Sequence, residues 1–228
     1  MSLQLPTSWR SLHPDLRVEV AAVADHHAAL HGEEQALVSQ AVASRRQEFS
    51  SGRLLAHQLL QAADRDVPAL LALEDRSPAW PDGILGSISH SRRWCAAAIA
   101  PQQRGLLGVG IDVEDARPFA SDLEEVILTA RERAWLTQSQ ADGPSLALSA
   151  FSIKEAVYKA VHPCGNVGLG FHAMELDFRE DPQRPQLLPS ADLLRRLPEA
   201  TLPQVHHLRQ NDVLLSLVLI ADRLASSA

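Results

Sequence analysis

Lysine is almost absent from this chain, and arginine supplies nearly all of its positive charge. Among the 21 lysine and arginine residues, the only lysines are Lys154 and Lys159, which flank Glu155. An ammonium is a compact point charge and a guanidinium is a planar fork, so the two are not interchangeable at a phosphate or proton-transfer site. The pair therefore indicates either a reaction centre or a weak surface pairing of Glu155 with Lys159.

The chain also has few cysteines, no long apolar run and no excess of positive charge. The two cysteines, Cys95 and Cys164, lack metal-ligand spacing, which favours a reduced cytoplasmic protein with free thiols. The first ten residues do not resemble a signal peptide, and the most apolar run, residues 213–221, is shorter than the roughly 20 residues of a membrane helix. The net charge of −7 argues against general nucleic-acid binding.

Periodicity predicts an α+β fold built from two similar halves, residues 1–107 and 108–228, each with a long helix followed by a pair of strands. The elements expected in the first half are a strand over 17–24, a helical stretch over 33–63 with a break near residue 44, and strands over 86–89 and 94–100. Those expected around and after the seam are a strand over 106–114, a helix from a Ser121–Glu124 capping box to about residue 138, a helix over 145–162, and strands over 174–178 and 214–220. The segment between the last two strands is interpreted as a polar connection.

Two carboxylates are expected side by side on the strand over 106–114. Residues two apart on a strand face the same way, so Asp112 and Glu114 share one side while the apolar residues between them face the core. Gly108 and Gly110 would let a backbone or a ligand approach closely. A hard divalent ion such as Mg²⁺ would relieve the repulsion between the carboxylates; the alternative is a solvated acidic strand end.

The helix over 145–162 carries a third carboxylate on a polar face. At about 100° per residue, Glu155 and Lys159 share that face with two aromatic side chains, Phe151 and Tyr158. The opposite face is apolar and made of small residues, and Lys154 falls at the border between the two faces. Three carboxylates and two ammonium groups suit the binding of a pyrophosphate with Mg²⁺.

Together these segments closely resemble the two-part motif of the 4′-phosphopantetheinyl transferases, of the larger monomeric type found with surfactin and enterobactin synthases. The resemblance covers roughly residues 45–160. The segments that carry it are Gly110-Ile111-Asp112, Phe151-Ser152-Ile153-Lys154-Glu155-Ala156-Val157-Tyr158-Lys159, Ser87-Ile88-Ser89-His90-Ser91, Arg45-Arg46-Gln47-Glu48-Phe49-Ser50-Ser51-Gly52-Arg53 and Trp80-Pro81-Asp82-Gly83. Two departures are His57, where related sequences often carry arginine, and Asp75, in place of a more usual glycine.

The resemblance implies Mg²⁺-dependent transfer of the 4′-phosphopantetheine arm from coenzyme A to a serine of an apo acyl or peptidyl carrier protein. It implies two similar α+β halves with the active site at their interface, a monomer, and no nucleic-acid or membrane partner. The pathways served would be siderophore, nonribosomal peptide, polyketide or fatty-acid synthesis.

The residue roles that the resemblance implies fall into three groups. The metal ligands would be Asp112, Glu114 and Glu155. The catalytic residues would be Glu155, or a metal-bound water in its place as the base, and Lys159. The residues that bind coenzyme A would be Arg45, Arg46, Arg53, Arg76, Ser89, His90, Lys154 and Lys159.

Other residue patterns favour structural roles over chemistry. A zinc site at His26, His27 and His31 is disfavoured against solvated or capping roles, and His206-His207 is interpreted as a loop pair. Cys95 lies in an apolar strand, which favours a buried, inert thiol. The Arg92-Arg93 turn could attract the acidic surface of a carrier protein.

Two rival functions remain at this point. One is a coenzyme A- or carrier-binding module without catalysis. The other is a metal-dependent nuclease built on Asp112 and Glu155, which the acidic net charge of −7 disfavours.

Overall fold

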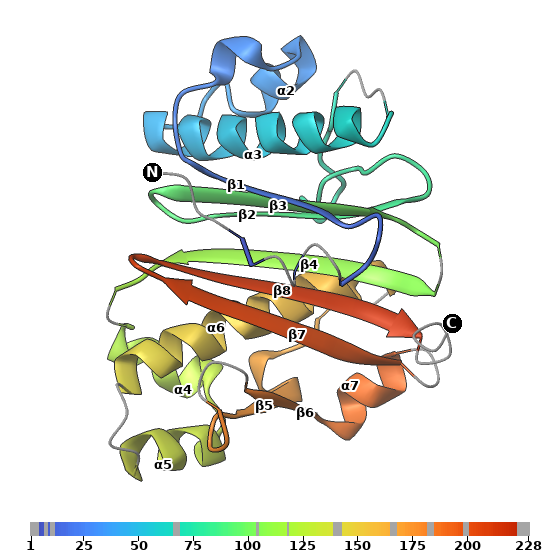
Figure 1. Cartoon of the computed structure of the whole chain (residues 1–228). Coiled ribbons are helices and arrows are strands. Elements are labelled where there is room, and N and C mark those ends of the chain that lie inside the picture. Colours follow the sequence, from blue (N-terminus) through green and yellow to red (C-terminus); the bar gives the residue numbers. More distant parts are fainter. Residues whose placement is uncertain are drawn as a thin grey trace. The chain divides into compact units, whose positions relative to one another are not determined.

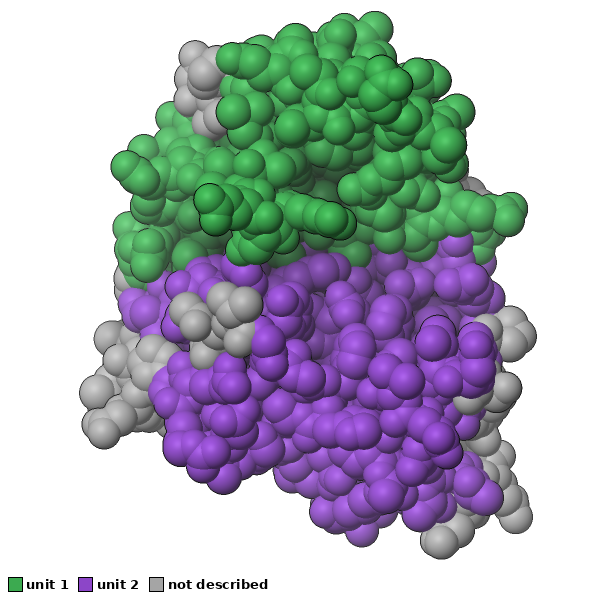
Figure 2. All heavy atoms as spheres, turned by 180° about the vertical axis from the view of Figure 1, so that it is seen from behind, with its two compact units in different colours: residues 1–103 green, residues 104–228 purple. Residues whose placement is uncertain are grey.

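The computed structural model describes residues 5–6, 9, 12–65, 69–103, 105–117, 119–138, 143–164, 168–181, 185–197 and 201–222. The chain divides into two compact units, Met1–Gln103 and Arg104–Ala228, which Figure 2 shows in green and purple. This division falls just before the seam that the sequence predicts at residue 108. Among the described residues, no helix has both the length and the apolar character needed to cross a membrane.

Unit 1 is a three-stranded antiparallel sheet covered by one long helix. Its elements are β1 (Arg17–Ala22), α2 (Gly32–Leu37), α3 (Ala43–Ala62), β2 (Ile84–His90) and β3 (Trp94–Pro101). The strand order is β1-β3-β2, and α3 lies along one face of this sheet (Figure 1). The predicted strands, and the predicted helical stretch with its break between α2 and α3, are confirmed.

The α3 helix lies close to its sheet because a glycine faces the strands. A Cβ atom added at Gly52 would lie 2.8 Å from Cγ2 of Ile88 and 3.5 Å from Sγ of Cys95. Leu55, Leu59 and Leu60 of α3 then pack with Ile99 of the central strand to form the core of this unit. Residues 94–100 of the central strand are buried throughout.

Unit 2 repeats this plan with additional elements. Its main sheet contains β4 (Leu106–Asp115), β7 (Thr201–Gln210) and β8 (Val213–Asp222) in the antiparallel order β4-β8-β7, and α6 (Gly143–Val161) packs on it. The other elements are α4 (Glu124–Ile127), α5 (Ala130–Gln138), the separate hairpin β5 (Met174–Asp177) and β6 (Gln186–Pro189), and α7 (Ala191–Arg196). In Figure 1, α6 lies against β4 and β8.

The two units have the same connectivity. In each, a strand is followed by a long helix and then by two strands, the last of which lies in the middle of the sheet. The fold is therefore α+β, as predicted. The shared connectivity supports the predicted pseudo-duplication of the chain.

Three sequence predictions for unit 2 are wrong. The helix predicted over 121–138 is interrupted, because Leu128 adopts an extended backbone and is fully buried, and α5 then begins anew. The connection predicted between residues 178 and 214 contains β6, α7 and β7, so that the pair His206-His207 lies on a strand and not in a loop. The predicted pairing of 174–178 with 214–220 is not formed, since β5 pairs with β6, and β8 pairs with β4 and β7.

Strand β4 and helix α6 approach so closely that their backbones touch. A Cβ atom at Gly108 would lie 1.9 Å from the carbonyl oxygen of Ala160, and one at Gly110 would lie 1.9 Å from that of Ala156. The predicted small-residue face of α6 makes this contact possible, and the backbone approach predicted for the two glycines is confirmed. The contact brings the polar residues of α6 next to those of β4.

Replacing Gly110 with alanine is expected to destabilise the protein, because a methyl group cannot fit against the Ala156 carbonyl without moving α6. We expect a loss of about 1–3 kcal/mol in the free energy of unfolding, measured by urea denaturation. The matched control is Gly170→Ala, since a Cβ atom there would meet nothing within 4 Å. Equal stabilities of the two variants would contradict the close contact.

Candidate active site

The polar face of α6 meets the end of β4 through a short ion pair. Nζ of Lys159 donates to Oδ1 of Asp112 at 2.7 Å and to the carbonyl oxygen of Ile111 at 3.2 Å. Asp112 is only 3% exposed, whereas Lys159 and Glu155 are half-buried, so this face remains partly accessible to solvent. The structure thus joins the Lys159 and Asp112 motifs that the sequence separates by 47 residues.

Burial and the charge of Asp112 raise the pKa of both glutamates at this point. Burial and, to a smaller extent, the charge of Asp112 raise the pKa of Glu114 to about 8. Burial also raises the pKa of Glu155, where Lys159 opposes the shift and Asp112 adds to it. An additional cation would stabilise the ionised form of both glutamates.

The donor set fits a hard divalent ion. Asp112, Glu114 and Glu155 offer only carboxylate oxygens, which are the ligands that Mg²⁺ prefers in proteins. Within the described ranges, no three histidine, cysteine or acidic side chains already converge as a metal cluster, and Lys159 is the cation that pairs with Asp112. Burial disfavours the ionised form of both glutamates and the charge of Asp112 adds to this, so a bound cation would favour their ionised form.

Lys154 does not lie on this face. Its side chain is fully buried, and Nζ donates to Oε2 of Glu132 at 2.7 Å and to the carbonyl oxygen of Ile127 at 2.8 Å. The predicted position at the border of the polar face is therefore wrong, because α4 and α5 cover that side of α6.

A second polar cluster lies in unit 1 and contains two of the predicted nucleotide-binding residues. Arg45 lies on α3 and His90 ends β2, and Nη1 of Arg45 is 2.7 Å from Nε2 of His90. Glu48 lies close to both, with Oε2 at 3.7 Å from Nη1 of Arg45 and 3.5 Å from Nδ1 of His90. Arg45 is half-exposed, so an anion could reach it from solvent.

Arg53 is a buried cation without a counterion. The residue is 5% exposed, its Nε has no hydrogen-bond partner, and its guanidinium lies 4.7 Å from the centre of the Phe49 ring. Desolvation lowers its pKa to about 10, while Glu34 raises it and Arg45 lowers it. No ion pair joins Arg53 to any carboxylate in the described part of the chain.

The remaining predicted residues are dispersed over unit 1. Arg46 is half-buried on α3, Ser89 is buried on β2, and Arg76 is exposed in the loop before β2. Arg76 has a φ of 70°, a left-handed conformation that costs a non-glycine residue roughly 1–2 kcal/mol. The departure at His57 has a local explanation, since its Nε2 lies 2.8 Å from Oε1 of the buried Glu34.

Two family models match the chain, one in each unit. The model described as the 4′-phosphopantetheinyl transferase N-terminal domain matches residues 33–100, and that of the 4′-phosphopantetheinyl transferase superfamily matches residues 108–215. The chain belongs to the 4′-phosphopantetheinyl transferase family. The superfamily match extends well past residue 165, where the sequence motifs end.

The chain is also similar in sequence to individual proteins of this family. The chain is 33% identical over 149 residues to 4′-phosphopantetheinyl transferase Svp of Streptomyces mobaraensis, which covers 64% of this chain and 60% of that protein. It is 38% identical over 119 residues to enterobactin synthase component D of Salmonella typhi, covering 51% and 48%. It is 30% identical over 148 residues to 4′-phosphopantetheinyl transferase Npt of Nocardia iowensis, covering 65% and 66%. The chain thus matches between about half and two thirds of the length of these family members.

Sequence reasoning missed a polar network behind the candidate site. His207 on β7 places Nδ1 at 3.0 Å from Oγ of Ser216 and Nε2 at 3.1 Å from Oγ of Ser149, and Ser216 lies 2.8 Å from Oγ of Ser152. Ser216 is also the strand partner of Asp112 on β4. The network adds polar contacts between α6 and the sheet to those that Lys159 makes with β4.

Other predictions about single residues agree with the structure. His31 caps α2 in a capping box with Glu34, in keeping with the capping role predicted for the N-terminal histidines. Cys95 is fully buried and burial raises the pKa of its thiol to about 12, which is the predicted inert state. Both cysteines are free thiols.

His207 is expected to make stability fall in mild acid. Desolvation, and to a smaller extent Arg209, lowers its pKa from 6.5 to about 4 in the folded state. Because the folded pKa lies below the unfolded value, the contribution of His207 is complete above pH 6.5 and is lost as the pH falls toward about 4, by at most about 1.4 kcal/mol per pH unit. Urea denaturation at several pH values should show a smaller acid loss for His207→Gln than for the unchanged protein. Parallel pH profiles would contradict a neutral, partly buried imidazole.

Proposed function

We propose that this chain transfers the 4′-phosphopantetheine arm of coenzyme A to a serine of an apo acyl or peptidyl carrier protein. The observation that carries the proposal is the pairing of Asp112 with Lys159 beside Glu114 and Glu155, in a chain of this family. The transfer forms a bond between the serine oxygen and the phosphorus of the arm. It breaks the bond from that phosphorus to the bridging oxygen, so that adenosine 3′,5′-bisphosphate leaves.

In the proposed reaction, Asp112, Glu114 and Glu155 hold Mg²⁺. The ion, when bound, supplies positive charge to the pyrophosphate oxygens and offsets the negative charge that develops on the leaving group. The raised proton affinity of the two glutamates without it fits this role.

Lys159 and Glu155 carry the remaining chemistry of the proposal. The side chain of Lys159 is 25% exposed, and its Nζ can contact a phosphate oxygen of coenzyme A while keeping the Asp112 carboxylate in place. Glu155, whose pKa is raised by burial, can accept the proton of the attacking serine hydroxyl, unless a metal-bound water does so.

We assign the nucleotide end of coenzyme A to the basic residues of unit 1. Arg45, Arg53 and His90 would contact its phosphates, with Arg46, Ser89 and Arg76 as further contacts. The buried, unpaired guanidinium of Arg53 supports this assignment, because such a charge is costly until an anion binds it. The proposal requires these residues and those of unit 2 to act on the same coenzyme A molecule.

The proposal includes a cytoplasmic, monomeric enzyme. Free thiols fit a reducing compartment, and size-exclusion chromatography with light scattering would test the oligomeric state. One similar protein is enterobactin synthase component D, which favours a carrier protein of siderophore or other secondary metabolism among the candidate acceptors.

The direct test is mass spectrometry of apo carrier proteins after incubation with this protein, coenzyme A and Mg²⁺. We expect the mass of one phosphopantetheine arm on the acceptor serine, and none when the metal is chelated. Asp112→Asn should lower kcat by about 100-fold or more, because it removes a charge at the reacting phosphates. The control Asp192→Asn, in an exposed ion pair on α7, should leave kcat unchanged.

Absence of any mass gain across a panel of apo carriers would contradict the proposal. If coenzyme A then still binds, a binding module without catalysis is the remaining function. Comparison of kcat/KM across the panel would identify the preferred acceptor.

The variant Arg53→Met should weaken binding of coenzyme A without lowering the stability of the fold. Methionine fills similar space without a buried charge, so we expect a melting temperature equal to or above that of the unchanged protein. The KM for coenzyme A should rise about tenfold or more, since a charged hydrogen bond to phosphate is worth about 1.5–3 kcal/mol. The exposed Arg65→Met serves as the control and should change neither quantity. A lowered melting temperature with an unchanged KM would mean that Arg53 is a structural residue.

A further inference from the structure

Lys154 is isolated from solvent although it directly precedes the candidate catalytic Glu155. Its side chain has 0% exposure, and its ammonium is held by the Glu132 carboxylate at 2.7 Å and the Ile127 carbonyl at 2.8 Å. A phosphate of coenzyme A could reach this ammonium only if both contacts broke and the covering helices moved. The role of a coenzyme A ligand, implied by the family motif, does not agree with this environment.

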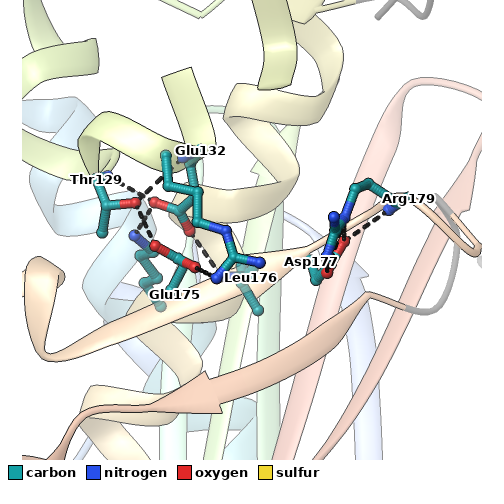
Figure 3. Close-up of polar contacts among 8 residues, drawn as sticks. Thr129, Glu132, Glu175, Leu176, Asp177 and Arg179 are labelled. Atoms are coloured by element: carbon teal, nitrogen blue, oxygen red, sulfur yellow. Dashed lines mark hydrogen bonds and ion pairs between the residues drawn. The ribbon is translucent and has the colours of Figure 1, made fainter. Parts of the chain in front are cut away.

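Glu132 is fully used as an acceptor inside unit 2. Besides Lys154, its Oε2 accepts from the backbone N–H of Thr129 at 2.7 Å, and its Oε1 accepts from that of Leu176 at 2.8 Å. The backbone N–H of Glu132 donates in return to Oγ1 of Thr129 at 3.2 Å, which completes a capping box at the start of α5. Figure 3 shows Glu132 between Thr129 and Leu176, where one carboxylate joins α5 to β5.

This arrangement connects α6 to three other elements through one ion pair. The Ile127 carbonyl ends α4, Glu132 lies on α5, and Leu176 lies on β5. Thr129 also donates to Oε2 of Glu175 at 2.9 Å, which ties the same hairpin to the start of α5 (Figure 3). Lys154 therefore joins α6 by polar contacts to α4 and α5 and, through Glu132, to β5.

The ion pair of Lys154 with Glu132 constrains the rotation of α6 about its own axis. Successive helical residues differ by about 100°, so a fixed direction for Lys154 fixes the direction of Glu155. The contacts of Ala156 and Ala160 with β4 fix the same rotation from the sheet side. Glu155 and Lys159 are then held toward Asp112 by two independent constraints.

We propose that Lys154 is a positioning residue, which acts through its buried ion pair with Glu132 to hold Glu155 and Lys159 in register with Asp112, and that it does not bind coenzyme A. The inference deepens the proposed function and rests on it for its kinetic consequences. The structural part, the coupling of Lys154 to Glu132, can be tested without any enzymatic activity.

The test is a double-mutant cycle with Lys154→Met, Glu132→Gln and the double variant, in the full-length protein. Each single change leaves one buried charge without its counterion, whereas the double variant removes both charges. We expect the double variant to unfold at a higher temperature than at least one of the single variants. Additive losses in melting temperature would overturn the coupling, whether or not the protein transfers phosphopantetheine.

Kinetics distinguish positioning from phosphate binding. Both single variants should lower kcat at least tenfold, with the KM for coenzyme A changed less than twofold, and the double variant should recover part of kcat. The matched control is Lys159→Met, whose loss of activity Glu132→Gln should not restore. A rise in the KM of Lys154→Met that Glu132→Gln does not share would overturn the proposal.

If Lys154→Met does not fold, the variant Glu132→Gln still tests whether the ion pair positions the catalytic residues. A wild-type kcat in this variant would overturn the positioning role, because the carboxylate itself cannot contact coenzyme A from inside the unit. Failure of the unchanged protein to modify any carrier would refute the proposed function alone and would leave the melting-temperature cycle to test the ion pair.

Discussion

The backbone contact between β4 and α6 is the constraint on which the candidate site depends. With no side chain at Gly108 or Gly110, the carbonyl oxygens of Ala156 and Ala160 lie directly on the strand. At this separation a lysine on the next turn of the helix can reach an aspartate on the strand, and Lys159 does so at 2.7 Å. Larger residues at either glycine would move the helix outward and separate its polar face from the carboxylates of β4.

The buried and partly buried charged residues discussed above are of two kinds. Some are paired with each other, and others are placed to bind a ligand of opposite charge. Lys154 and Glu132 neutralise each other and satisfy their remaining hydrogen-bonding groups within unit 2. Arg53 is buried and forms no ion pair with any carboxylate among the described residues, and Glu114 and Glu155 have raised pKa values. Charges of the first kind need no ligand, because each is costly only when its partner is removed. Those of the second kind become favourable when a ligand of opposite charge is present, which suits an anion at Arg53 and a cation at the glutamates.

Strong periodicity made most elements predictable, and the failures have physical causes. The edge strand β7 escaped prediction because it carries Pro203, two histidines and other polar residues, which a solvent-facing edge tolerates and a central strand does not. The helix predicted over 121–138 has continuous periodicity through Leu128. It is broken because that side chain turns into the core and Thr129 with Glu132 forms a new cap, a Thr-x-x-Glu pattern that could have been read as a helix start.

The candidate site residues could be proposed from the sequence alone, since the spacing of Asp112, Glu114, Glu155 and Lys159 and the rarity of lysine singled out these groups. Local sequence also set the small-residue face of α6 that allows the close contact with β4. The sequence placed Lys159 on the face of Glu155 and Lys154 at its border, but it did not contain the burial of Lys154, because near the border of a helical face burial depends on which distant elements cover it. Glu132 lies 22 residues before Lys154 in the sequence. Because α4 and α5 pack against α6, Lys154 is buried and pairs with Glu132, although its motif resembles that of a phosphate ligand.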